Sequence, residues 1–173
     1  MAVMATEQDV AKLHHFMKER RLGVIATSGE GNRPEAALMS IAVTPNLEII
    51  FETTAATRKS ANLARNPRVS FVIGWQGDRT LQYDGLVDRP QGAEFDRIKA
   101  FFLSVFPQKT SDEFWPGNDY FRVRPRWIRF SDYNIPRKIE EFDFPVNESQ
   151  YPALQQGWWR RLRNPRPREK QRN

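Results

Sequence analysis

The chain contains no cysteine. Disulfide bonds, thiolate catalysis and cysteine-ligated metal sites are therefore excluded together. Histidine is nearly absent as well, since the only two, His14 and His15, are adjacent in the sequence. Neighbouring residues on a helix point in different directions, so this pair does not form a shared metal site, and we predict no bound metal.

Export and membrane signals are also missing. No segment reaches the length of apolar residues that a membrane-spanning helix needs. Residues 1–4 are too short for the apolar region of a signal peptide, and the acidic Glu7 and Asp9 follow closely. We therefore predict a cytoplasmic protein without membrane contact. A Walker-type nucleotide loop is excluded because Gly-x-x-x-x-Gly-Lys does not occur.

One domain accounts for most of the chain. Its 173 residues are 39% hydrophobic, with 12 Phe and 5 Trp, which is enough for one core. The formal net charge of +6 is uneven, because residues 151–173 contain seven Lys or Arg and one acidic residue, whereas the rest of the chain is formally neutral. The high pI therefore describes the C-terminal end and not a basic face of the fold.

The composition predicts three regions. Residues 1–133 form the domain, residues 134–159 form a polar, Pro-containing arm that extends over the body or over a partner, and residues 160–173 form a basic, disordered tail. Trp158 and Trp159 lie beside arginines, a pattern that favours a protein interface over stacking on nucleic-acid bases. The tail is expected to contact polyanions only weakly, and no nucleic-acid partner is predicted.

Short apolar runs separated by turns predict a mainly β fold with flanking helices. Helices are expected over residues 6–20, 57–65 and 92–106. The links between the predicted strands are too short for crossover connections, so an antiparallel barrel is favoured over a parallel sheet. The six expected strands cover residues 22–27, 36–43, 47–53, 69–75, 80–88 and 127–133.

The start of the second predicted helix has the pattern of a phosphate site. Thr57 is the natural N-cap, and Arg58 and Lys59 follow it directly. The first amides of a helix lack internal partners and lie at the positive end of its dipole, so they bind anions. Two cations at that end are unfavourable unless an anion is present. We therefore predict that these three residues converge on a phosphate group.

This segment resembles the pyridoxamine 5'-phosphate oxidase family of FMN-binding split barrels. The resemblance rests on Phe51 and Thr53 at the end of a strand, on Thr57-Arg58-Lys59, and on residues 66–70, where Asn-Pro-Arg-Val-Ser restarts the sheet. Weaker likenesses occur at residues 83–87 and 121–128, so the similarity covers residues 10 to 133. It implies a six-stranded antiparallel split β-barrel that binds FMN.

The resemblance also implies which residues contact the cofactor. In this family the Ser/Thr-Arg-Lys group holds the FMN phosphate, the second strand binds the flavin ring through its main chain, and a Gln often lies on the fifth strand. The two flavin sites lie between subunits, which implies a homodimer. The expected cofactor-binding residues are Leu38, Met39, Ser40, Thr53, Thr57, Arg58, Lys59 and Gln82.

The chain departs from pyridoxamine 5'-phosphate oxidase itself at two charged positions. Ala37 and Ala42 stand where that enzyme has an Arg at the start of the second strand and a Lys at the end of the flavin segment. The C-terminal substrate segment of that enzyme, rich in Trp, Arg and His, has no counterpart, because residues 157–160 follow a long arm and lack His. Oxidation of pyridoxamine 5'-phosphate is therefore not the expected activity.

We expect an FMN-dependent oxidoreductase that acts on an unidentified small molecule, planar or heteroaromatic, at a dimer-interface flavin site. Three alternatives stay open: a flavin-binding module for sensing or storage, a deazaflavin-dependent reductase, and a heme-binding barrel. Deazaflavin also carries a phosphate, so Arg58 and Lys59 do not separate it from FMN. Heme would need an axial His, and with only His14 and His15 available it is the least favoured. No catalytic residue is assigned.

Overall fold

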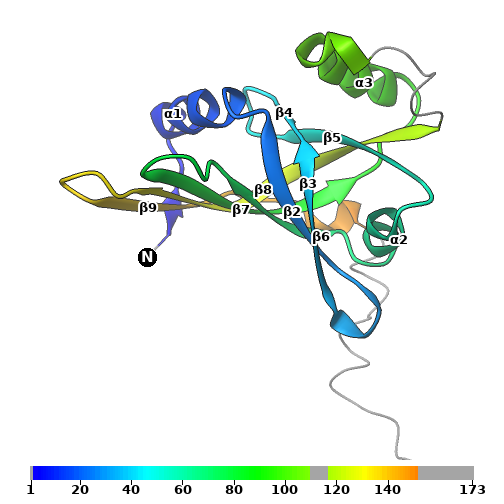
Figure 1. Cartoon of the computed structure of the whole chain (residues 1–173), viewed down its shortest axis with the longest axis horizontal. Helices are drawn as coiled ribbons and strands as arrows, with labels where there is room; N and C mark the ends of the chain where they lie inside the picture. Colours follow the sequence, from blue (N-terminus) through cyan, green and yellow to red (C-terminus); the bar gives the residue numbers. More distant parts are fainter. Residues whose placement is uncertain (1, 110–116, 152–173) are drawn as a thin grey trace, which may run out of the picture.

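Nine strands form one curled sheet in the computed structural model, which describes residues 2–109 and 117–151 (Figure 1). The strand order is β1-β9-β8-β7-β6-β2-β3, and β8 also pairs with β5, which pairs with β4. All pairs are antiparallel except β1 with β9. The strands are β1 (Val3–Met4), β2 (Leu22–Ser28), β3 (Pro34–Ser40), β4 (Ala42–Val43), β5 (Ile49–Thr54), β6 (Arg68–Ile73), β7 (Arg79–Asp88), β8 (Asn118–Asp132) and β9 (Lys138–Asp143).

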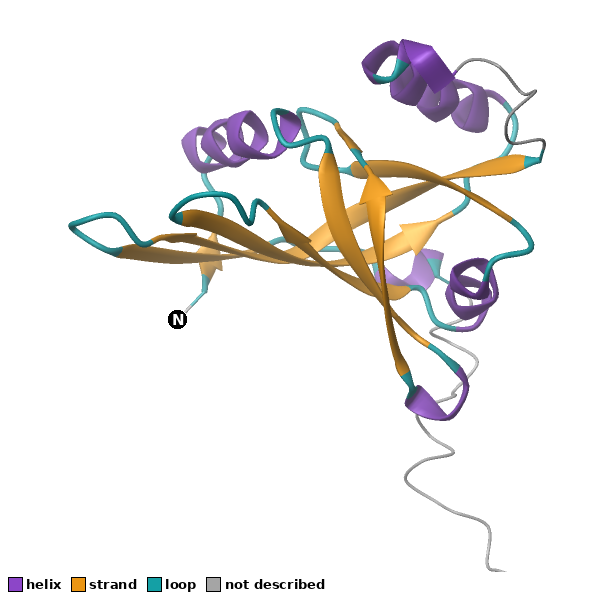
Figure 2. Ribbon diagram, viewed as in Figure 1, coloured by secondary structure: helices purple, strands orange, loops and turns teal. Residues whose placement is uncertain are grey.

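Three α-helices surround the sheet, and all three were predicted (Figure 2). Short 3-10 turns occur at Glu30–Asn32, Pro107–Lys109 and Glu148–Gln150. Thr6 caps the first helix, since its hydroxyl accepts from the Asp9 amide while the Asp9 carboxylate accepts from the Thr6 amide. The helices are α1 (Glu7–Lys18), α2 (Arg58–Arg65) and α3 (Ala93–Val105).

The antiparallel sheet confirms the expected fold class, but the count of six strands is wrong. The second predicted strand is divided at Ile41 into β3 and β4, and the last one is the second half of the 15-residue β8. β1 and β9 were not predicted. β9 falls in a polar segment and is stabilised by pairing with β8, a contact that local apolar periodicity does not report.

Large apolar side chains fill the interior of the curled sheet. Phe51, Phe71 and Tyr83 are fully buried there, and the Tyr83 hydroxyl donates to the main-chain oxygens of Leu47 and Val123 at 3.1 and 3.0 Å. The helix α1 closes one end of this core with its buried face, which consists of Leu13, Phe16 and Met17.

A second apolar cluster lies on the other side of β5 and holds α3. Ile50 and Tyr120 pack there against Ile98, Phe102 and Phe106. Ala42 of β4, 1% exposed, belongs to the same cluster. Because the first half of β5 is covered on both faces, Ile49, Ile50 and Phe51 form a continuous apolar run and not an alternating one.

The described part of the predicted arm packs on the body. β9 extends the sheet beyond β8, and the chain then returns so that Tyr151 is buried against Leu86 and its hydroxyl accepts from Arg124 at 3.0 Å. Arg124 and the buried Arg122 share the carboxylate of Asp88, so one ionic cluster joins this return to the barrel. The remainder of the arm and the tail, residues 152–173, lie outside the described residues.

Over residues 2–109 and 117–151, no helix combines the length and the apolar character needed to cross a membrane.

Candidate functional site

The N-terminus of α2 has the predicted cap. Thr57 has an extended backbone (φ −80°, ψ 148°), and its hydroxyl accepts from the amide of Ser60 at 3.2 Å. The helix ends at Asn66, which precedes Pro67 and returns the chain to the extended backbone of β6. The remaining first-turn amides of α2 are therefore directed out of the start of a short helix, as the sequence predicted.

A cluster of hydroxyl groups joins this cap to the end of β5. The hydroxyl oxygen of Thr53 lies 3.1 Å from that of Thr57, which also lies 3.1 Å from that of Ser60. The Thr57 and Ser60 hydroxyls donate to the main-chain oxygen of Thr54 at 3.1 and 2.7 Å. The structure thus brings Thr53 and Thr57 together, and their shared contacts hold the β5–α2 connection in one conformation.

The two predicted cations differ in their surroundings. The Arg58 side chain is 84% exposed, and its guanidinium lies 3.6 Å from a carboxylate oxygen of Glu35. Lys59 is half-buried, and in the described part of the chain no carboxylate lies within ion-pairing distance of its ammonium group. Burial lowers the pKa of Lys59 from its ordinary value, because the charged form loses hydration without gaining a counter-ion. An anion bound here would restore that stabilisation.

The sequence did not indicate the contact between Asn62 and Glu35 that lies behind these cations. The amide nitrogen of Asn62, a buried residue of α2, donates to the Thr27 hydroxyl at 3.1 Å and to the second carboxylate oxygen of Glu35 at 3.0 Å. Arg65 donates to the amide oxygen of Asn62 at 2.9 Å. Glu35 is therefore held beside the cations by a residue from a distant part of the sequence, and nothing in its own neighbourhood marks it.

These residues line a hollow of about 180 Å³ between β2, β3 and the start of α2. Its wall holds cations, hydroxyl-bearing residues and one carboxylate. The residues that matter most are Thr27, Glu35, Ala37, Thr57, Arg58 and Lys59. The hollow therefore offers an anion two positive charges and a cap, and it opposes that anion with one negative charge.

The main chain of β3 is open along one side. Among the described residues β3 pairs with β2 alone. The Ile41 amide donates to the main-chain oxygen of Arg21, and the Gly29 amide donates to that of Arg33, so both bonds continue the register of the β2–β3 ladder. Because hydrogen-bonded pairs alternate along an antiparallel ladder, the main-chain groups of the odd-numbered residues of β3 are directed toward β2. The N–H and C=O groups of Ala36, Leu38 and Ser40 are consequently directed to the open edge. This edge begins at the hollow, because Ala36 also lines it.

The predicted ring-binding residues thus divide between the two sides of β3. Leu38 and Ser40 present main-chain groups at the open edge, and the Leu38 side chain is 58% exposed on the outer face of the sheet. Met39 directs its main chain to β2 and packs its side chain against the core. The expected Leu38, Met39 and Ser40 segment therefore lies beside the hollow, with its alternate residues in different roles.

Gln82 lies apart from the other predicted residues. It is exposed on β7, which is separated from β3 by β6 and β2. One row across the outer face of the sheet contains, in order, Leu38, Val24, Val72 and Gln82. Leu38 and Val72 are 58% and 42% exposed, so the row leaves apolar surface uncovered. Gln82 belongs to this outer row and not to the hollow.

In chemical terms, the hollow fits an anionic group and the β3 edge fits a flat molecule with alternating donors and acceptors. The two lie end to end along β3. An extended ligand with a phosphate at one end and a planar polar ring at the other matches both parts.

The family model described as pyridoxamine 5'-phosphate oxidase matches residues 10–132. A search of curated proteins found no match.

Several solved structures share the fold. A heme binding protein from Mycobacterium smegmatis has a TM-score of 0.64 at 16% identity, over 82% of this chain and 60% of that one. A protein from Clostridium acetobutylicum, related to general stress protein 26 and described as belonging to the pyridoxinephosphate oxidase family, has a TM-score of 0.61 at 14% identity, over 81% and 97%. An FAD-binding protein from Mesorhizobium loti has a TM-score of 0.57 at 19% identity, over 68% and 87%.

At these identities the solved structures establish only the fold, which is a split barrel. They do not establish that the ligand is shared. The chain spans 60% of the length of the Mycobacterium smegmatis protein. The family model, in contrast, covers the larger part of the chain and includes α2, the hollow and the β3 edge. The chain therefore belongs to the pyridoxamine 5'-phosphate oxidase family.

Proposed function

We propose that this protein is an FMN-dependent oxidoreductase that acts on a small planar or heteroaromatic molecule. The observation that carries the proposal is the half-buried ammonium group of Lys59 at the N-terminus of α2, which has no ion-pair partner among the described residues and lies next to the open edge of β3. A phosphate at that position satisfies Lys59 and the free helix amides together. When bound, FMN supplies the redox chemistry, which no side chain of this barrel provides.

The residues of the chain have separate tasks in this proposal. Thr57, Arg58 and Lys59 hold the phosphate, and Thr53 keeps the cap in place through its hydroxyl. The main-chain groups of Ala36, Leu38 and Ser40 bind the polar edge of the ring. Because these groups belong to a strand that is fixed by β2, they orient the ring without a loss of side-chain entropy.

Other cofactors of the fold are supported less well. The chain has two histidines, and both are on α1, where His14 lies 3.3 Å from the main-chain oxygen of Val43 and His15 lies 3.5 Å from Glu19. Neither lines the hollow, which disfavours heme as an axially ligated group. FAD and a deazaflavin share the phosphate with FMN, so the mass of the bound cofactor separates the three.

The departures from pyridoxamine 5'-phosphate oxidase have physical consequences. Ala37 lines the hollow without a charge, and Ala42 is buried in the apolar cluster under α3, where a lysine could not be accommodated with its charge. The site thus has fewer cations for a second, phosphorylated molecule. A substrate without a phosphate group fits it better.

We further propose a homodimer in which the outer row, formed by Val24, Leu38, Val72 and Gln82, packs against a second copy. The row combines exposed apolar side chains with the amide of Gln82. On its own chain Gln82 is separated from β3 by two intervening strands, β6 and β2, so the flavin contact expected of it requires a second subunit. A homodimer accounts for both features.

Loss of the two cations is expected to weaken FMN binding. Each charge-assisted hydrogen bond contributes about 1.5–3 kcal/mol, so changing Arg58 and Lys59 together to Ala should reduce the affinity at least tenfold. Isothermal titration with FMN measures this. The matched control changes Arg97 and Lys99 of α3 to Ala, which removes the same charges at a distance from the hollow and should leave the affinity unchanged. Unchanged affinity in the Arg58 and Lys59 variant would show that the phosphate lies elsewhere.

Glu35→Gln is expected to have the opposite effect. Glu35 competes with the phosphate for Arg58 at 3.6 Å, and its charge repels an anion in the same hollow. Gln keeps an acceptor for Asn62, so the local contacts persist. Removing one like charge from a part-exposed site should tighten FMN binding by about 1 kcal/mol, roughly fivefold. Glu141→Gln on β9 is the control, and weaker FMN binding by the Glu35 variant contradicts the assignment.

Turnover is tested by anaerobic reduction of the FMN-loaded protein, followed by the loss of flavin absorbance. We expect reduction by NADPH, NADH or a small aromatic donor, and little or none by pyridoxamine 5'-phosphate, for which Ala37 and Ala42 supply no charges. Rapid reduction by pyridoxamine 5'-phosphate overturns this expectation. If no donor in a broad panel reduces the flavin, the protein is a flavin-binding module and not an oxidoreductase.

The homodimer is tested by light scattering at micromolar concentration. The wild type should have the mass of two chains, and Val72→Glu should shift it toward one, because a charge would be buried in the interface. Ile135→Glu, at a side chain that is 99% exposed away from the outer row, is the control. A wild-type monomer that still binds FMN refutes the proposed interface.

A further inference from the structure

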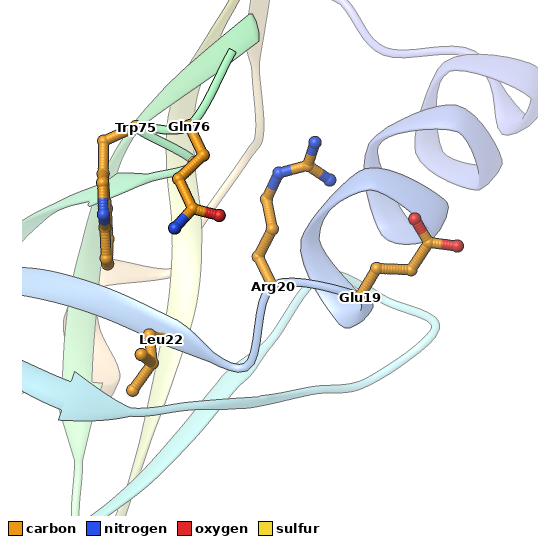
Figure 3. Close-up of a pocket in the computed structure, with 6 residues that line it drawn as sticks. Glu19, Arg20, Leu22, Trp75 and Gln76 are labelled. Atoms are coloured by element: carbon orange, nitrogen blue, oxygen red, sulfur yellow. The ribbon is translucent and has the colours of Figure 1, made fainter.

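A second pocket lies away from the hollow, between the end of α1, the start of β2 and the turn after β6 (Figure 3). Its volume is about 360 Å³, within the range of small-molecule sites. It shares no lining residue with the hollow at α2. The lining residues are Glu19, Arg20, Leu22, Gly74, Trp75 and Gln76.

Arg20 is held in this pocket as a fixed donor. Its guanidinium lies 3.4 Å from the centroid of the Phe16 ring and donates to the Phe16 main-chain oxygen at 2.6 Å. Phe16 is itself buried and packs edge-on against Phe130. These contacts fix one face and one nitrogen of the guanidinium, whose remaining N–H groups make no hydrogen bond within the described residues.

The charge of Arg20 is not compensated. In the described residues no carboxylate forms an ion pair with it, and Glu19, the nearest acid in the sequence, lies instead 3.5 Å from His15. Burial lowers the pKa of Arg20 below its ordinary value, even though Glu19 and its negative charge act in the other direction. Arg20 is therefore a partly desolvated cation that no carboxylate of residues 2–109 and 117–151 pairs with.

Gly74 makes this arrangement possible. Its φ is +77°, and a Cβ atom there would lie 2.8 Å from both the Phe16 ring and the Arg20 Nε. Any other residue would be strained and would displace the guanidinium. The close approach of the β6 end to α1 thus forms one wall of the pocket.

The opposite wall is apolar and accessible. Trp75 is 50% exposed and Leu22 is 39% exposed. In Figure 3 the Gln76 side chain lies between the Trp75 ring and the Arg20 side chain, with Leu22 below and Glu19 on the far side of Arg20. The pocket therefore combines a flat aromatic surface, a guanidinium and an amide.

We infer that this pocket binds a planar aromatic molecule that carries one carboxylate. The guanidinium of Arg20 matches a carboxylate through two parallel hydrogen bonds, and the exposed ring of Trp75 offers a stacking surface for the aromatic part. An inorganic anion would leave Trp75 and Leu22 uncovered, and an uncharged ring would leave Arg20 unpaired. The inference does not depend on the flavin proposal, because the two sites share no residue.

The test is isothermal titration of the full-length protein with 2-naphthoate, and with 2-naphthamide and acetate as comparison probes. We expect 2-naphthoate to bind at least tenfold more tightly than either comparison probe. Equal binding of the amide removes the role of the carboxylate, equal binding of acetate removes the role of the ring, and absence of 2-naphthoate binding overturns the inference.

Variants locate the site. Arg20→Met and Trp75→Leu should each weaken 2-naphthoate binding at least tenfold, whereas Arg33→Met and Trp127→Leu, elsewhere on the surface, should not. Because Arg20→Met also loses contacts with Phe16, Arg20→Lys provides a second variant that keeps the charge but not the two-pronged geometry, and it should weaken binding as well. Trp75→Phe should retain most of the affinity. Unchanged affinity in both Arg20 variants refutes the site.

Discussion

The open edge of β3 is the feature on which the candidate site depends. A strand edge without a partner leaves N–H and C=O groups unsatisfied, and proteins usually cover or blunt such edges. Here the chain leaves β3 through Ile41 into β4, which pairs with β5 and not with β2, so the sheet curls without closing beside β3. The alternation of the β2–β3 ladder then directs Ala36, Leu38 and Ser40 outward. A planar ligand with its own donors and acceptors is a natural complement to that edge.

Electrostatics at α2 would set the orientation of such a ligand. Thr57 satisfies one amide of the helix start, and Arg58 and Lys59 add positive charge to an end that is already positive. Glu35 offsets part of this charge through Arg58, while Lys59 is partly desolvated and has no ion-pair partner in the part of the chain that the structure describes. An anion bound at this site would therefore compete with Glu35 for Arg58. This balance explains how two cations are tolerated at a helix N-terminus in the free protein.

Much of this arrangement could be predicted from the sequence because it is local. The α2 cap and its neighbouring cations lie within a few residues of one another, and hydrophobic periodicity indicated all three helices and most strands. Glu35 and Asn62 could not be predicted as partners, because their contact depends on how α2 packs on β2 and β3. The same holds for β9, whose polar sequence forms a strand only because β8 provides an edge with which it pairs. Gln82 was chosen by type, and its distance from β3 follows from sheet order, which local patterns do not determine.

The central claim is that the start of α2 binds the phosphate group of a flavin. Calorimetric titration of the wild-type protein with FMN and with riboflavin, under identical conditions, tests it most directly, because the two ligands share the ring and differ by the phosphate. We expect FMN to bind at least tenfold more tightly than riboflavin, with one site per chain. Equal affinity for the two ligands would contradict it, since the ring would then bind without help from Thr57, Arg58 and Lys59.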